Sequence, residues 1–340
     1  MISTKPRVLI TGHMGFIGSW VTYDYWKNGW EVYGLDNRSS YGERLYDKAN
    51  LSKIMADEYL GDIVDASHWT PWLSKINPQL IVHLAGQAIV PRAFSEPCLT
   101  FRTNALGTLT VLEAARQQLS VKAVLCVTSD KVYENNNDGR PFVETDALGG
   151  GDIYSVSKSS SEMISRAYKI AHIGDRDLSI QTVRLGNVVG GGDWSKNRLL
   201  PDLIYAMAHE KEFRVRYMKA TRPFQNVADV VKGISLIAAS ALDKGVPSGE
   251  AWNLGPKDNT FASVHDVIEL FKKDYPNLMV IDELHRNKED LNLCVSVEKY
   301  STRFVSPRDT SLESLERTLR WYKAFDAGMD LVELIQSDLY

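Results

Sequence analysis

Short apolar runs alternate with longer amphipathic segments through the first half of the chain. Runs rich in Val, Ile and Leu, with the length of buried strands, occur at residues 7–11, 31–36, 80–85, 123–129 and 179–186. Helical spacing and length are found between them, at residues 16–29, 98–118 and 154–171. The repeated order of strand, helix and strand predicts an α/β fold with a doubly wound parallel Rossmann sheet.

The pattern changes beyond residue 187. Gly-rich turns in "VVGGGDW" are followed there by shorter helices and strands. We therefore expect two domains, a dinucleotide-binding Rossmann domain over residues 1–186 and a smaller substrate-binding lobe over residues 187–340.

A glycine-rich turn links the first predicted strand to the first predicted helix. The stretch "TGHMGFIG" places Gly12, Gly15 and Gly18 there, and glycines permit a tight turn with backbone close to a pyrophosphate. The start of the helix, with Phe16 and Ile17, would offer N–H groups to the phosphates. The other interpretation is a plain connection between a strand and a helix.

The end of the second predicted strand favours cofactor binding. Asp36 stands where a carboxylate accepts both ribose hydroxyls of NAD and repels a 2′-phosphate, so we predict NAD. Asn37 follows, and Arg38 could pair with such a phosphate, which keeps NADP as the less favoured cofactor. Asp62, followed by Ile63 after another short strand, either bonds the adenine amine or caps a helix.

Tyr154 and Lys158 are one helical turn apart in "YSVSK". The ammonium group can then lie beside the phenol and lower the pKa of Tyr154 toward that of a usable base. Ser129 ends the strand at residues 123–129, and open parallel sheets bind ligands at such ends. Ser129 would hydrogen-bond the substrate oxygen whose proton Tyr154 removes, which predicts hydride chemistry on an alcohol. The alternative is a surface helix that carries an unrelated Tyr and Lys.

With these residues the chain resembles the extended short-chain dehydrogenase/reductase superfamily over essentially its whole length, and within it the CDP-glucose 4,6-dehydratases. The resemblance rests on the stretches "TGHMGFIGSW", "HLAGQAIV", "TNALGTLTVLEAAR", "VTSDKVYEN", "LGGGDIYSVSK", "RLGNVVGGGDW" and "RPFQNV". It implies oxidation of the sugar at C4 by enzyme-bound NAD, elimination of water across C5 and C6, and return of the hydride to C6. The expected product is CDP-4-keto-6-deoxyglucose, a precursor for deoxysugar and polysaccharide biosynthesis.

The same resemblance assigns the two residues after Ser129. Asp130 and Lys131 stand where related dTDP-glucose enzymes carry an Asp-Glu pair, which implies Asp130 as the acid for the departing 6-hydroxyl and Lys131 as the base for the C5 proton. Because the two side chains attract one another as charged groups, function requires that they diverge or that the substrate separates them. An exposed Asp-Lys turn after a strand is the alternative.

Further site residues are assigned from the same resemblance. The nucleotide and its diphosphate are expected to contact Asn187, Arg198, Leu199, Arg222 and Gln225. The nicotinamide ribose and the neighbouring loops are expected to contact Leu84, Ala85, Gln87 and Asn104. Gln87 and Asn104 could instead be structural hydrogen-bonding residues. The stretch "RPFQNV" departs from the pattern of the CDP-glucose branch at Phe224 and Asn226.

Composition narrows the partners and the compartment. A net charge of −4 without a block of Lys and Arg argues against nucleic acid. The strand pattern begins at the N-terminus without a signal-peptide pattern, and no run of about 18 apolar residues occurs, so we expect a cytoplasmic protein without membrane contact. The Cys and His residues lack metal-ligand spacing, so no metal is predicted. The resemblance implies a homodimer or higher homo-oligomer through helices 98–118 and 154–171.

Two other functions stay open at this point. A nucleotide-sugar 4-epimerase or 4-reductase would need Ser129, Tyr154, Lys158 and the cofactor, but not Asp130 and Lys131. A regulator that senses NAD(P) without turnover would need none of these side chains, and their presence argues against it.

Overall fold

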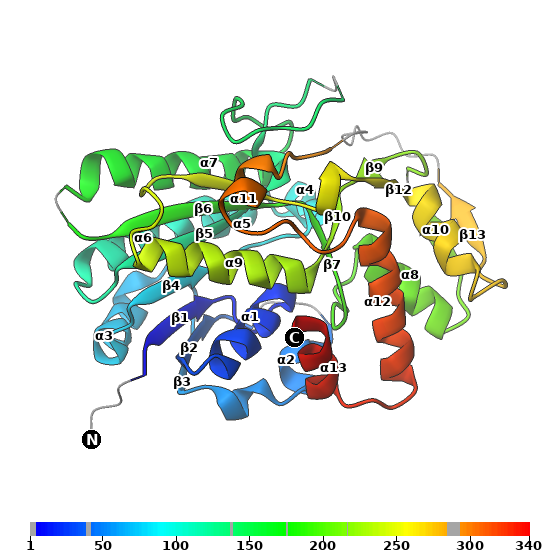
Figure 1. Ribbon diagram of the computed structural model, residues 1–340, viewed down its shortest axis with the longest axis horizontal. Helices are drawn as coiled ribbons and strands as arrows, with labels where there is room; N and C mark the ends of the chain where they lie inside the picture. The colour runs from blue at the N-terminus through cyan, green and yellow to red at the C-terminus, as the bar shows by residue number, and fades with distance from the viewer. Residues whose placement is uncertain (1–4, 39–41, 137–138, 175, 216, 284–292) are drawn as a thin grey trace.

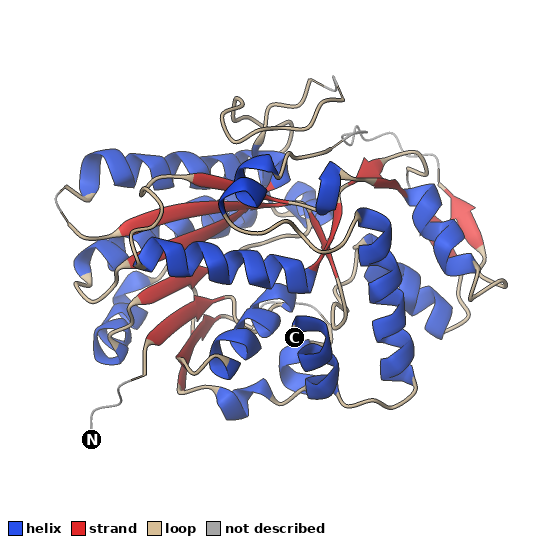
Figure 2. Cartoon of the chain, in the orientation of Figure 1, coloured by secondary structure: helices blue, strands red, loops and turns tan. Residues whose placement is uncertain are grey.

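The computed structural model describes residues 5–38, 42–136, 139–174, 176–215, 217–283 and 293–340, in which strands and helices alternate (Figure 2). The strands are β1 (Arg7–Thr11), β2 (Glu31–Asp36), β3 (Asp57–Leu60), β4 (Leu80–His83), β5 (Ala123–Ser129), β6 (Ser179–Leu185), β7 (Asn187–Val189), β8 (Phe213–Val215), β9 (Thr221–Arg222), β10 (Phe224–Asn226), β11 (Ala251–Leu254), β12 (Ala262–Ser263) and β13 (Val280–Asp282).

The helices cover both faces of the sheet and build the C-terminal part of the chain (Figure 1). The α-helices are α1 (Phe16–Lys27), α2 (Leu45–Lys48), α3 (Ala66–Ile76), α4 (Val90–Ser95), α5 (Pro97–Phe101), α6 (Gly107–Gln117), α7 (Ile153–Ala167), α8 (Leu199–Ala208), α9 (Val227–Leu242), α10 (Val264–Lys272), α11 (Glu298–Arg303), α12 (Ser311–Asp326) and α13 (Leu331–Leu339). Shorter or wider helical turns are η1 (Leu51–Ile54), η2 (Arg102–Leu106), η3 (Asp130–Val132), η4 (Tyr168–His172) and η5 (Lys257–Asn259).

The described residues form a seven-stranded sheet in the order β11-β6-β5-β4-β1-β2-β3, and all neighbouring strands in it are parallel. This confirms the predicted doubly wound α/β fold. The strand order reverses between β1 and β4, where Thr11 is in register with His83. Ligands of such sheets bind in the crevice outside this reversal, at the carboxyl ends of the strands.

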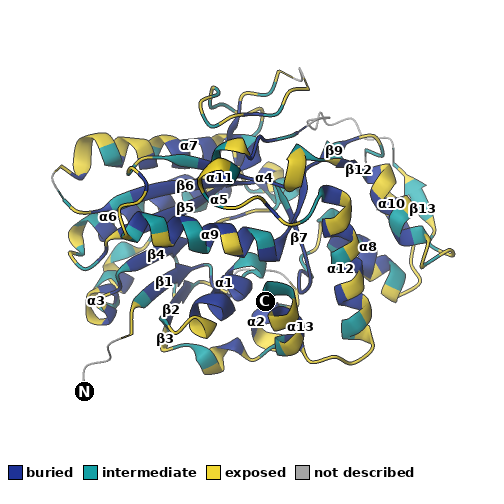
Figure 3. Ribbon diagram, in the orientation of Figure 1, coloured by how far each residue is buried: buried dark blue, intermediate teal, exposed yellow. Residues whose placement is uncertain are grey.

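Alternate side chains of each strand supply two separate cores, which appear as dark blue strands between the helices in Figure 3. Val8 and Ile10 of β1 pack with α1 and α9 on one face. Leu9, between them, packs with α3 and α6 on the other face. Burial on both faces explains why these strands read as continuous apolar runs in the sequence.

The expected helix at residues 98–118 is a succession of α5, the π-helical turn η2 and α6, and the helix expected at 154–171 runs through α7 into η4.

The segment beyond residue 187 packs against the first half of the chain. β11 pairs with β6 at the edge of the central sheet, and α9 packs on its face. The boundary at residue 186 therefore does not separate two cores, and the division into a cofactor domain and a substrate lobe stays a prediction.

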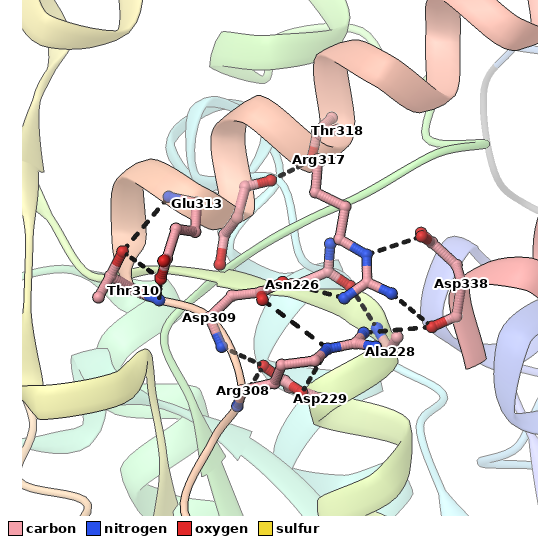
Figure 4. Close-up of polar contacts among 11 residues, drawn as sticks. Asn226, Ala228, Asp229, Arg308, Asp309, Thr310, Glu313, Arg317, Thr318 and Asp338 are labelled. Atoms are coloured by element: carbon pink, nitrogen blue, oxygen red, sulfur yellow. Dashed lines mark hydrogen bonds and ion pairs between the residues drawn. The ribbon is translucent and has the colours of Figure 1, made fainter. Parts of the chain in front are cut away.

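A cluster of charged side chains ties the C-terminal helices to α9 (Figure 4). Arg317 of α12 donates to Asp309 at 3.0 Å and to Asp338 of α13 at 2.7 Å, while Asp229 of α9 accepts the backbone N–H groups of Arg308 and Asp309. Burial raises the pKa of Asp229 and of Asp338. Burial and the neighbouring carboxylate of Asp229 raise the pKa of Asp309 to about 6.

This cluster predicts an unusual pH dependence of stability. Because the pKa of Asp309 rises from 3.8 to about 6 on folding, its protonation stabilises the native state, and that stability is lost as pH rises through about 6. Relative to Asp309→Asn, the wild type should gain up to about 3 kcal/mol of unfolding free energy as pH falls toward 4, since each pKa unit is about 1.4 kcal/mol. Urea unfolding at several pH values measures the difference.

Glu313 supplies a control of opposite sign. Hydrogen bonds from Thr310 lower the pKa of Glu313 in the capping box of α12, so its contribution is present above its ordinary pKa and is lost as pH falls. The difference between the wild type and Glu313→Gln should therefore shrink toward low pH. The same pH trend in both variants would contradict the assignment to Asp309.

Candidate active site

The turn between β1 and α1 leaves space where side chains would otherwise be. Gly12 has a φ of +74°, and a Cβ atom on it would lie 2.7 Å from the backbone nitrogen of Ala85. A Cβ atom on Gly18 would overlap the carbonyl oxygen of Gly12. Gly15 is the N-cap of α1 and offers no side-chain cap, so the first N–H groups of the helix are left for a ligand. Such a helix start suits a phosphate group.

Asp36 is fixed at the end of β2 beside this turn. Its carboxylate accepts the backbone N–H of Met14 at 3.2 Å and that of Arg38 at 2.7 Å. Arg38 adopts a left-handed conformation with φ +56°, and its side chain is 55% exposed and lies 4.0 Å from Asp47. The carboxylate is therefore held at the crevice, whereas the guanidinium group points along the surface.

A cavity of about 820 Å³ extends from the glycine turn across the carboxyl ends of β1, β2, β4 and β5 to β6. Among the residues expected at the site, its lining includes Gly12, Gly15, Phe16, Ile17, Gly18, Asp36, Asn37, Asp62, Ile63, Leu84, Ala85, Gln87, Ser129, Tyr154, Lys158 and Arg198. The cavity has the position and the glycine turn that a dinucleotide requires, and the Asp36 carboxylate lies in its lining.

Other expected residues lie outside this cavity. Asn187 and Leu199 line a smaller adjoining cavity of about 50 Å³, to which Arg198 also contributes. The lining of neither cavity contains Arg38, Asn104, Asp130, Lys131, Arg222 or Gln225. Two of them contact its lining, since Asp130 accepts the hydroxyl of Ser129 and Asn104 accepts the backbone N–H of Gln87.

Sequence reasoning named Leu84, Ala85, Gln87 and Arg198 but missed neighbouring residues of the same two loops that line the larger cavity. The segment after β4 contributes Gly86, Pro91, Arg92 and Glu96, and the segment before α8 contributes Ser195 and Lys196. The rule that ligands meet the carboxyl ends of strands could have indicated the first loop, because β4 is central in the sheet. No comparable signal marks the second loop.

Asp62 lies beside the cavity but does not cap a helix, because the N-cap of α3 is Asp65. Its carboxylate lines the cavity and also accepts the backbone N–H of Val64 at 3.0 Å, as in a local turn. The other oxygen pairs with Arg102 of the π-helical turn η2 at 2.5 Å. Contact of Asp62 with an adenine amine stays a prediction.

Asn104 is a buried structural residue behind the site. Its side chain accepts the backbone N–H of Gln87 at 2.8 Å, donates to the carbonyl of Gln87 at 3.1 Å and donates to Ser157 of α7 at 2.9 Å. It therefore joins the loop after β4 to the helix that carries Tyr154. Asn104 lies in the π-helical turn η2, and single π turns are frequent at functional sites.

Ser129, Tyr154 and Lys158 converge at the end of β5. Burial raises the pKa of Tyr154 to about 12, and the Ser129 hydroxyl opposes this shift. Burial lowers the pKa of Lys158 to about 8, and its ammonium group donates to the carbonyl of Val127 at 3.2 Å. Burial therefore outweighs the expected activation of the phenol in this structure.

Asp130 and Lys131 form the turn η3 beyond Ser129. Asp130 is 4% exposed, and its Oδ1 accepts the hydroxyl of Ser129 at 3.0 Å. The Lys131 side chain is 14% exposed, and its Nζ lies 3.9 Å from Oδ2 of Asp152. Among the described ion pairs none joins Asp130 to Lys131, and the two side chains contact different partners, Ser129 and Asp152. An exposed Asp-Lys turn does not describe this arrangement.

The candidate phosphate-binding residues differ in their surroundings. Arg198 precedes α8, lines both cavities and pairs with the buried Asp193 at 2.8 Å. Arg222 is buried in β9, and its side chain donates to the carbonyl of Thr221 at 2.8 Å. Gln225 is buried in β10, and its Nε2 has no hydrogen-bond partner among the described residues. Of the three, Arg198 is best placed to meet a diphosphate.

A buried network that sequence reasoning missed supports this corner. Glu162 of α7 accepts hydrogen bonds from Thr128 at 2.5 Å and from Arg184 of β6 at 2.9 Å. Arg184 also donates to the hydroxyl of Tyr133 at 2.8 Å. Burial by itself lowers the pKa of Arg184, and the Glu162 carboxylate more than reverses this effect. The network connects α7 to β5 and β6 at Thr128, the residue before Ser129.

Comparison with known proteins agrees with this site. Residues 8–255 match the NAD dependent epimerase/dehydratase family. The chain belongs to this family. It is 30% identical to a CDP-glucose 4,6-dehydratase of Salmonella typhimurium over 335 residues, which cover 96% of this chain and 93% of that protein. Membership confirms the expected resemblance to the extended short-chain dehydrogenase/reductase superfamily.

Other members of the family have different activities. The chain is 26% identical to a dTDP-glucose 4,6-dehydratase of Shigella flexneri, over 98% of this chain and 96% of that protein. The structure of the Thermotoga maritima UDP-glucose 4-epimerase with UDP-glucose shares the fold, with a TM-score of 0.81 and 23% identity over 94% of this chain and 99% of that one. The family thus includes both dehydratases and epimerases.

Two further observations concern membranes and metals. None of the helices in the described part of the chain has the length and apolarity needed to cross a bilayer. Within the same described residues, His, Cys, Asp and Glu side chains do not gather in groups of three that could hold a metal ion.

The Arg184–Glu162 pair gives a test of what supports the site. Arg184→Ala leaves the Glu162 carboxylate buried without its main counter-charge, so we expect a loss of about 3 to 5 kcal/mol of unfolding free energy. Urea unfolding measures the loss. Arg166→Ala removes an exposed arginine from α7, the helix of Glu162. It should change the unfolding free energy by less than about 0.5 kcal/mol. Equal effects of the two substitutions would show that the buried pair does not support the fold.

Proposed function

We propose that the protein is a nucleotide-sugar 4,6-dehydratase with tightly bound NAD that converts CDP-glucose to CDP-4-keto-6-deoxyglucose. The observation that carries the proposal is the buried corner after β5, where Asp130 and Lys131 follow Ser129 beside Tyr154 and contact different partners. An epimerase has no use for an added acid and base at that place.

NAD is preferred to NADP because of the two side chains after β2. Asp36 lines the cavity where a ribose would lie, and its charge would repel a 2′-phosphate. Arg38 points away along the surface, where it cannot compensate for that repulsion. A relative in the family, the dTDP-glucose 4,6-dehydratase of Streptomyces venezuelae, has a structure with NAD bound, and it shares this fold with a TM-score of 0.81.

The side chains of this chain would divide the proton transfers. The cofactor, when bound, accepts the hydride from C4 of the sugar and returns it to C6. Tyr154 would take the proton of the 4-hydroxyl while Ser129 holds that oxygen. The resulting ketone acidifies the C5 proton, which Lys131 would remove, and Asp130 would protonate the departing 6-hydroxyl. When the hydride returns to C6, Lys131 would give its proton back to C5, and the proton taken by Tyr154 balances the one that leaves with water. The protein thus catalyses the loss of water with no net oxidation.

The base of the nucleotide is the least constrained part of the proposal. Arg198 and, by resemblance, Asn187, Arg222 and Gln225 would hold the nucleotide and its diphosphate, with guanidinium groups matched to phosphate oxygens. The CDP-glucose enzyme of Salmonella typhimurium supports cytidine through its 30% identity. We place the enzyme in the cytoplasm, where nucleotide sugars would reach it.

We also propose a homodimer, or a higher homo-oligomer, formed by α5, α6 and α7. Large apolar side chains are exposed along these helices and the turns that join or continue them, at Phe101, Leu106, Val156, Met163 and Ile170. Their burial against a second copy would remove them from water. Sedimentation should give a dimer or larger species at micromolar concentration, and Met163→Glu should shift it toward monomer. Only monomer for the wild type would contradict the proposal.

The activity test compares nucleotide sugars. Purified protein should convert CDP-glucose to a product that lacks one water molecule, without consumption of added NAD, as seen by mass spectrometry. The dTDP, UDP and GDP sugars are incubated in parallel to define the nucleobase. A product of unchanged mass with altered C4 configuration would instead establish an epimerase.

Lys131→Ala separates the steps of the proposed reaction. Without the base the enzyme should oxidise C4 and stop, so absorbance of reduced nicotinamide should persist after substrate is added. Tyr154→Phe is the matched comparison, because it should block the earlier step and leave no such absorbance. Full turnover by Lys131→Ala would exclude the role assigned to this residue.

A further inference from the structure

Asp152 stands directly before the helix that carries Tyr154 and Lys158. It is the N-cap of α7, and its Oδ1 accepts the backbone N–H of Ser155 at 2.9 Å. Its Oδ2 accepts the hydroxyl of Ser155 at 3.0 Å. A carboxylate at this place also suits the positive end of the helix dipole.

The same carboxylate faces Lys131. Its Oδ2 lies 3.9 Å from Nζ of Lys131, and the two side chains are 16% and 14% exposed. This degree of burial separates the pair from ordinary surface ion pairs, in which water and salt screen most of the attraction. One carboxylate therefore contacts both the helix start and the proposed base.

Backbone hydrogen bonds bring the two residues together. The segment before α7 lies beside η3. The backbone N–H of Gly149 donates to the carbonyl of Val132 at 2.8 Å, and the backbone N–H of Glu134 donates to that of Ala147 at 2.9 Å. Tyr133 and Leu148 pair between them as an isolated antiparallel bridge. The proximity of Asp152 to Lys131 is thus built into the path of the main chain, and does not depend on one side-chain rotamer alone.

Other charged and titratable groups surround this corner. Asp130 lies on the same turn as Lys131. The charges of Asp130, Asp152 and Arg198 all influence the pKa of Tyr154 at the start of α7. Burial, together with the charge of Asp130, raises the pKa of Cys294, which comes from the segment after β13. Of these groups, Asp152 forms the described ion pair with Lys131.

We propose that Asp152 is a positioning residue that holds the amine of Lys131 apart from Asp130 and fixes it relative to the helix of Tyr154 and Lys158. The inference rests on the proposed dehydratase function. Lysine has a long flexible side chain, and a displacement of about 1 Å at a reacting group can reduce a rate by about a hundredfold. Asp152 would thus act on the elimination step, which uses Lys131, and leave C4 oxidation intact.

Asp152→Asn tests the proposal because it removes the charge and keeps an oxygen for the N-cap. With CDP-glucose, reduced nicotinamide should form at the wild-type rate and then decay at least tenfold more slowly. Incorporation of solvent deuterium at C5 should slow by the same factor. Asp152→Ser, which also caps helices without a charge, should behave alike.

Controls separate positioning from a loss of structure. The melting temperature of Asp152→Asn should stay near that of the wild type, whereas Asp152→Ala should melt lower because it loses the cap. Asp146→Asn removes another ion pair of the same loop, with Arg140, and should leave both steps unchanged. In a Lys131→Ala background, Asp152→Asn should leave the rate of formation and the persistence of reduced nicotinamide unchanged, because the residue acts through Lys131.

The outcomes distinguish this inference from the function on which it rests. If the wild type removes water from CDP-glucose and Asp152→Asn eliminates as fast or faster, Asp152 does not position Lys131. Equal slowing of oxidation and elimination would assign Asp152 to the helix cap alone. If the wild type itself removes no water from any nucleotide sugar, the proposed function fails, and this inference fails with it.

Discussion

The parallel arrangement of the central strands is the constraint on which the site depends. Because β1, β2, β4, β5 and β6 run in one direction, their carboxyl ends meet at a single edge, and the last polar residues of distant segments become neighbours. The reversal of strand order between β1 and β4 parts the connecting loops at that edge and leaves room for a ligand. The glycine turn, Asp36, Ser129 and Tyr154 share a cavity for this reason.

Burial dominates the electrostatics of the reacting corner. It shifts the pKa of the Tyr154 phenol upward to about 12 and that of Lys158 downward to about 8, because burial disfavours the charged form of each group. The charges that the corner does keep are paired, as Glu162 is with Arg184.

Much of this arrangement could be predicted from the sequence, and the limits have physical causes. Continuous apolar runs identify buried parallel strands because both faces are covered, and the glycine turn and Asp36 have roles fixed by local backbone geometry. The pairing of Arg184 with Glu162 and that of Lys131 with Asp152 depend on side chains that tertiary packing alone brings together. No periodicity or spacing encodes such contacts. The activating effect of Lys158 on Tyr154 was expected from spacing, but burial outweighs it here.

The position of β11 has a consequence for how the chain must be assembled. This strand comes from far along the sequence, yet it covers the outer edge of β6 in the central sheet. A chain that has emerged only as far as β6 would display a row of unsatisfied backbone N–H and C=O groups beside an apolar surface, which is a template for aggregation. The first half can therefore fold without aggregation only after the second half has been synthesised. A fragment that ends after β6 would aggregate and would not fold independently.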